Sequence, residues 1–166
     1  PKGNAKVQSP AFIDSNEGRG DQKLSTNGRY WVFASYSNRL PRNDLDVALV
    51  YRRDLVTGRI EVVSRANGTE GQIAEMANNP VMSPDGNFVA FSAYGQLDPA
   101  DTNDDSDVYL RDVAAGTTTL ISRADGPGGA VADRGASRPS VSADGNIVSF
   151  SSDSTNLGDP SLNQAV

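Results

Sequence analysis

Apolar and polar residues alternate along this chain in short runs that follow glycine-containing turns. The motif Ser83-x-Asp85-Gly86 precedes an apolar run that ends at Phe91, and similar runs end at Phe33 and Phe150, 58 and 59 residues away. Alternation with a period of two predicts β-strands, and no segment shows the sustained 3.6-residue apolar period of a helix. The sequence therefore predicts an all-β protein built from repeats.

The second copy of the repeat predicts four strands, at residues 80–83, 87–92, 108–111 and 117–122. Tight turns at 84–86 and 112–116 separate the first pair and the last pair, with glycine at the left-handed position. Both faces of the second strand carry apolar groups, which is typical of a sheet packed between two neighbours. Four antiparallel strands covered on both faces and repeated along the chain predict β-propeller blades.

The repeat units span approximately 20–78, 79–137 and 138–166, and the last is incomplete. Residues 5–8 stand where the fourth strand of a preceding blade would end. Residues 1–166 thus form one segment of about two and a half blades, whereas known propellers close with four to eight. Two interpretations follow: a partial propeller from a longer chain, or a homodimer that completes a ring of about six blades, in which residues 162–166 substitute for a missing strand.

Composition excludes several classes of function. The formal net charge of −6 argues against nucleic-acid binding, and no apolar run reaches the length that a membrane helix needs. The chain has no cysteine and no histidine, which removes disulfides, thiolate sites and Ser-His-Asp catalysis. No catalytic constellation is recognisable, so we expect a non-enzymatic protein. The chain begins without methionine or an apolar leader, which indicates a mature, trimmed or fragmentary chain.

The most distinctive local feature is an acidic loop with oxygen-bearing side chains at alternate positions. These are Asp101, Asn103, Asp105 and Asp107, and Asp98 stands nearby. Calcium prefers six to eight oxygen ligands, so this spacing predicts a Ca²⁺ site, although the loop lacks the glutamate and central glycine of an EF-hand. The alternative is a solvated acidic loop in which Asp107 caps a strand.

Other candidate residues have structural explanations beside the functional ones. Asp54 and Asp112 each precede a glycine turn, and we expect each to accept backbone hydrogen bonds from its own turn. Arginines near strand ends either line a ligand channel or pair with aspartates between blades. Trp31 and Tyr94 could each stack on carbohydrate. For Trp31 the alternative is packing in the core.

The turn motif and the strand that ends in Phe-Ser resemble the TolB-like repeat, a WD-like bacterial β-propeller family. The resemblance rests on 83–86 with Phe91-Ser92, on 142–145 with Phe150-Ser151, and on 107–112 followed by 116–119. It implies a secreted, periplasmic or cell-surface scaffold that binds protein or glycan through rim loops. Two alternatives are the propeller portion of a larger hydrolase or peptidase, with catalytic residues outside this chain, and a carbohydrate-binding module. The first copy departs from the motif, with Thr26-Asn27 in the turn and a less acidic loop at 43–46.

Overall fold

A computed structural model describes residues 22–42, 47–125 and 128–158. These residues form ten β-strands and no helix, so this part of the chain contains no helix that would cross a membrane. The prediction of an all-β fold is confirmed. The predicted strand at 5–8 and the substitute strand at 162–166 lie outside the described residues.

Each repeat unit forms its own antiparallel sheet. The first sheet contains β1 (Gln22–Leu24), β2 (Tyr30–Ser35), β3 (Leu49–Asp54) and β4 (Ile60–Val62), in that spatial order. The second contains β5 (Met76–Met82), β6 (Phe88–Tyr94), β7 (Asp107–Asp112) and β8 (Thr117–Leu120), again in chain order. The third contains β9 (Ala136–Val141) and β10 (Val148–Ser152). Two four-stranded propeller-type blades and the first half of a third are therefore present.

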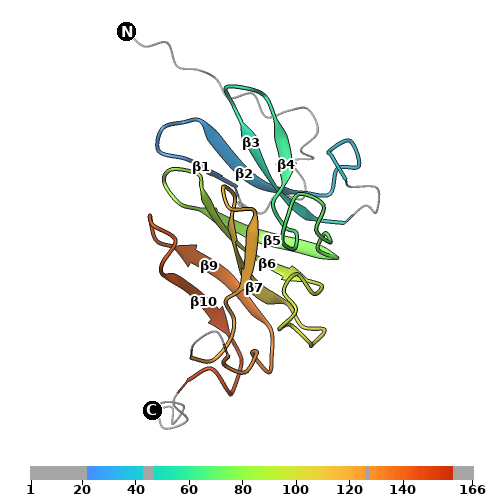
Figure 1. The fold of residues 1–166 in the computed structure, drawn as a ribbon, viewed down its shortest axis with the longest axis vertical. Coiled ribbons are helices and arrows are strands. Elements are labelled where there is room, and N and C mark those ends of the chain that lie inside the picture. Colours follow the sequence, from blue (N-terminus) through green and yellow to red (C-terminus); the bar gives the residue numbers. More distant parts are fainter. Residues whose placement is uncertain (1–21, 43–46, 126–127, 159–166) are drawn as a thin grey trace.

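The three sheets follow one another in a stack, from the β1–β4 sheet to the β9–β10 sheet (Figure 1). Because successive strands are antiparallel, the tight turns fall at one rim, and the β2–β3 and β6–β7 loops begin at the other, the long-loop rim. The β4–β5 loop instead reaches the tight turn of the next unit, where the Gly68 N–H donates to the Gly116 carbonyl at 2.8 Å. The first strand of each later sheet lies against the preceding sheet, β5 against β2 and β9 against β6. At the long-loop rim the β6–β7 loop meets the β8–β9 loop, because the Asn103 amide donates to the Ala132 carbonyl at 3.3 Å.

The strand β5 begins at Met76, earlier than the predicted start at Pro80. Its pairing with β6 changes register between Asn78 and Val81, and Asn79 adopts a left-handed φ of 51°. Arg138 of β9 has the same conformation, with φ of 54°. This bulge interrupts the alternation of side chains, so the apolar pattern alone does not reveal the first half of the strand.

The tight turn between the first two strands of each unit is held by its own serine. Ser83 Oγ donates to Asp85 Oδ1 at 2.6 Å and accepts from the Phe88 backbone N–H at 3.0 Å. Ser142 and Asp144 repeat these bonds in the third unit at 2.6 and 3.0 Å. In the first unit Asn27 replaces the aspartate and accepts from Ser25 at 2.7 Å, so the departure from the motif leaves the turn unchanged.

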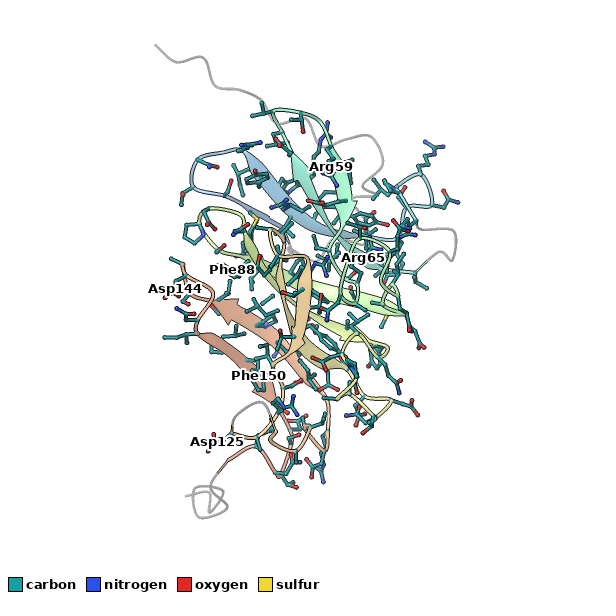
Figure 2. All side chains as sticks on the ribbon, viewed as in Figure 1. Arg59, Arg65, Phe88, Asp125, Asp144 and Phe150 are labelled. Carbon is teal, nitrogen blue, oxygen red and sulfur yellow. The ribbon has the colours of Figure 1, made fainter. Side chains whose placement is uncertain are left out.

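The glycine of this turn is the point at which neighbouring units touch. Gly86, with φ of +83°, lies so close to Tyr30 of the first sheet that an added Cβ would stand 2.4 Å from the ring. Gly145 lies in the same way against Phe88, at 2.6 Å, and Figure 2 shows Phe88 beside the turn of Asp144. A side chain at either glycine would push the sheets apart, so both the conformation and the close approach require glycine.

The core consists of aromatic and β-branched residues on the strands. Phe33 stacks on Tyr51 with ring centroids 5.7 Å apart, and Phe91 stacks on Tyr109 at 6.0 Å. Phe33 and Phe91 are 2% and 0% exposed, as expected from the sequence. Phe150 is only half-buried, because β10 pairs with β9 alone within the described residues and no third strand covers it.

We predict that Phe91→Ala lowers the free energy of unfolding by about 3–5 kcal/mol, because it opens a cavity in a closed core. Phe150→Ala removes a half-buried ring and lowers the free energy of unfolding by at most about half as much. Urea denaturation of the two variants beside the wild type measures the difference. Equal losses would show that the third unit is as closely packed as the second.

Candidate functional site

The long-loop rim is where chemistry-bearing side chains gather. The loop after β6, residues 95–106, carries the acidic run, and it packs on the next unit through the Ala136 N–H, which donates to the Ser106 carbonyl at 2.7 Å. Asp98 anchors the loop from within. Its Oδ1 accepts from the Ala100 N–H at 2.9 Å and its Oδ2 from the Leu120 N–H at 3.1 Å. Asp98 thus fixes the loop against β8.

The four residues predicted as calcium ligands differ in their surroundings. Asp101 and Asp107 are buried, at 3% and 0% exposure, whereas Asn103 is half-buried and Asp105 is exposed. Asn103 Oδ1 accepts from the Asp105 N–H at 2.6 Å, and its amide donates to the Ala132 carbonyl at 3.3 Å. The loop therefore places two acids inside the protein and leaves one at the surface.

Asp107 begins strand β7 with its carboxylate in the core. Its Oδ1 accepts a hydrogen bond from Ser122 Oγ at 2.5 Å, and Ser122 in turn accepts from the Val108 N–H at 2.9 Å. The other oxygen, Oδ2, is buried without a hydrogen-bond partner among the described residues. Burial raises the pKa of Asp107 to about 6. The Ser122 hydrogen bond and the Asn103 side chain oppose this rise, and the nearby carboxylates of Asp101 and Asp105 add to it.

Asp101 is held by the aromatic side chain that stacks on Phe91. The Tyr109 hydroxyl donates a short hydrogen bond to Asp101 Oδ2, and the Asn103 N–H donates to Asp101 Oδ1 at 3.2 Å. Burial, together with this hydrogen bond, raises the pKa of Tyr109 far above its ordinary value. Tyr109 therefore acts as a fixed donor that positions Asp101.

The first repeat shows that the blade does not need an acid at position 107. Leu49 stands 58 residues earlier, begins strand β3 as Asp107 begins β7, and is 1% exposed. Ser64, the counterpart of Ser122, still accepts from the Val50 N–H at 3.0 Å. A buried carboxylate with an unsatisfied oxygen is unfavourable, so Asp107 is a candidate for a role other than packing.

The described residues contain no group of three or more acidic side chains arranged to hold a metal ion. The structure brings Asp101 and Asp107 close enough for their charges to interact, with Asp105 farther out at the surface. The Ca²⁺ site therefore stays a prediction. Sequence reasoning missed Ser122 and Tyr109 as partners of the acids, although comparison of Leu49 with Asp107 in the aligned repeats would have singled out the buried carboxylate.

The other candidate residues have mostly structural roles. Asp54 accepts from the Val56 N–H at 2.9 Å and Asp112 from the Ala115 N–H at 2.9 Å, which confirms that they hold their own turns. The hydrogen bond from Arg29 holds the pKa of Asp54 well below its usual range. Trp31 is 6% exposed and packs in the core.

Within the described residues, the expectation that arginines pair with aspartates between units is wrong. Arg29 pairs with Asp54 and Arg52 with Glu61, each inside the first unit. Arg111, which is buried, donates to the backbone carbonyls of Ala66 and Gly68 in the preceding unit, at 3.0 and 3.1 Å. Arg65 and Arg123 each donate to a carbonyl of their own loop. At the junction between the first and second units, loop carbonyls outside the strands accept these bonds, and a guanidinium with several donors can bridge them.

Comparison of the sequence with protein-family models finds no match, and comparison with curated proteins finds no significant match. Among solved structures, the fold is similar to the crystal structure of TolB from Acinetobacter baumannii. The identity is 17% and the TM-score 0.48, over 80% of this chain and 26% of that chain. The chain thus spans about a quarter of that protein's length, and the fold assignment rests on the strands and sheets themselves.

The raised pKa of Asp107 predicts a pH dependence of stability. The folded chain binds this proton more tightly than the unfolded chain, so the free energy of unfolding falls as the pH rises from about 4 to about 6. We expect Asp107→Leu to abolish this fall and, in EDTA at pH 7, to stabilise the chain by on the order of 2–3 kcal/mol.

Urea denaturation in EDTA between pH 4 and pH 8 measures this effect, with Asp125→Asn, which removes an exposed charge outside the acidic loop, as the control. The lowered pKa values of Asp54 and Asp144 act below this window and affect all three proteins alike. Parallel pH profiles for the wild type and Asp107→Leu would contradict the assignment.

Proposed function

We propose that this chain is part of a propeller-type, non-enzymatic binding scaffold and that the acidic loop on its long-loop rim is the binding element. The observation that carries the proposal is the Oδ2 of Asp107, which has no hydrogen-bond partner among the described residues and stands at a position where the first repeat has Leu49. A protein that keeps a destabilising carboxylate beside a surface loop gains from what that carboxylate binds.

The ligand class that suits this loop is a divalent cation, Ca²⁺ first. A cation would be a positively charged partner for the carboxylate of Asp107 and would reduce the repulsion between Asp107 and Asp101. Asn103 and Asp105 would add oxygen ligands from the same loop, together with backbone carbonyls and water, after a rearrangement of the loop. Binding would fix the 95–106 loop at the junction with the third unit.

The partner class that suits the rim is a protein or a glycan. Tyr36 and Tyr94 occupy equivalent places at the ends of β2 and β6, at 39% and 40% exposure. Exposed tyrosines beside polar loops are typical of binding surfaces, because the ring stacks and the hydroxyl bonds to water or ligand. A secreted, periplasmic or cell-surface location agrees with such a scaffold. A glycan array tests the glycan class. Binding that is lost in Tyr94→Ser and kept in Val56→Ser, which lies on the opposite rim, would assign a glycan ligand to this surface.

Calcium should raise the melting temperature if the acidic loop binds it. At a free concentration 100-fold above the dissociation constant, a ligand stabilises the folded state by about 2.7 kcal/mol. For a chain of this size that corresponds to a rise of roughly 5–10 °C over EDTA.

Differential scanning fluorimetry in EDTA, Mg²⁺ and Ca²⁺ tests this expectation. Asp107→Leu should remove the response, whereas Asp125→Asn, which removes an exposed charge outside this loop, should keep it. An unchanged melting temperature of the wild type in 5 mM Ca²⁺ would exclude the cation site.

A further inference from the structure

The two internal junctions of the chain define what a complete contact between units looks like. Tyr30 covers Gly86 and Phe88 covers Gly145. At each junction, the aromatic ring that follows the tight turn of one unit therefore packs on the turn glycine of the next unit. Within the described residues, the corresponding positions of the third and first units remain uncovered. Ile147 is 70% exposed, and no described atom lies within 4 Å of a Cβ built at Gly28.

We propose that these two uncovered surfaces bind each other between two copies of this chain. In this contact the Gly28 turn of one copy lies on Ile147 of a second copy, as Gly86 lies on Tyr30 within one chain. The partner of the Ile147 face is thus the Gly28 turn of a second copy. This contact has the same geometry as the two internal junctions. The inference goes beyond the proposed cation site and does not depend on it.

Neighbouring groups on both surfaces match the internal junctions. Leu24 on β1 is 52% exposed, whereas its counterpart Met82 packs on the core. At the first internal junction the Thr26 N–H donates to the Pro84 carbonyl at 2.8 Å. Ala143 occupies the place of Thr26 in the third unit, so its N–H would donate to the Thr26 carbonyl of the second copy.

The strand beside Ile147 makes this junction weaker than the internal ones. Ser149, which is exposed, stands where the second unit has the fully buried Ala90. The serine side chain is small enough to permit the approach of another sheet, but its hydroxyl reduces the apolar area that the contact buries. We therefore expect a reversible association that depends on protein concentration.

A closed arrangement of two copies satisfies both ends at once. The Ile147 face of each copy meets the Gly28 turn of the other, so the pair has two-fold symmetry and both of these surfaces are covered in each copy. Each copy contributes two four-stranded blades and the first half of a third, so a ring of two copies holds four complete blades and two half-blades, within the four to eight that propellers use.

Sedimentation velocity of the 166-residue chain over a range of concentrations tests the proposal. We expect a two-copy species in the wild type and at least a tenfold weaker association in Ile147→Arg and in Gly28→Ala. The matched control is Gly58→Ala, because Gly58 has a similar φ of +77° and equally open surroundings but lies in the turn between β3 and β4. This control should associate like the wild type, and circular dichroism should show the same β content in all four proteins.

A crosslinking experiment gives a second readout that does not depend on dissociation. Because the chain has no cysteine, Gly28→Cys combined with Ile147→Cys introduces the only thiols, and oxidation should join two copies covalently. Gly58→Cys combined with Ile147→Cys should remain uncrosslinked. A wild type that stays monomeric at roughly 100 µM, association that survives both single variants, or equal crosslinking of the two pairs would each overturn the proposal.

Discussion

The contact of a turn glycine with an aromatic ring of the preceding unit sets the spacing of the whole stack. Gly86 and Gly145 approach Tyr30 and Phe88 so closely that no side chain fits between them. This approach lets the first strand of each unit lie flat on the sheet before it, which buries Val32, Val89 and Ala90 completely. The units have little apolar surface to bury within a single sheet, so their stability depends on this stacking.

The same stacking determines where function can reside. It aligns the tight turns on one rim and the β2–β3 and β6–β7 loops on the other, where loops of successive units meet through hydrogen bonds such as Ala136 to Ser106. Beside the tight turn at the other end of β7, Arg111 adds a second link between units by donating to the carbonyls of Ala66 and Gly68 of the preceding unit. A rigid rim of this kind can hold an acid such as Asp107 in an unfavourable environment, because many contacts elsewhere fix the strands that flank it.

Local signals in the sequence predicted the strands, the turns and the two-sided sheets, since each of these depends on residues close together in the chain. The half-burial of Phe150 was not predicted, because it depends on β10 having no neighbour other than β9 among the described residues. The bulge at Asn79 was not predicted, because it depends on a backbone conformation. The acidic loop was identified, but the burial of Asp107 against Ser122 depends on pairing between β7 and the chain after β8. Arginine partners were wrongly assigned, because opposite charges in a sequence do not reveal which carbonyls a fold leaves unpaired.

The most direct test of the account compares the unfolding free energies of Gly86→Ala and Gly58→Ala. Both glycines have positive φ, so both variants carry the backbone strain of an alanine in that conformation, but only Gly86 lies against a ring. The account predicts that Gly86→Ala loses about 1–3 kcal/mol more than Gly58→Ala, which is the usual effect of overpacking. Equal losses would contradict the claim that this contact holds the units together.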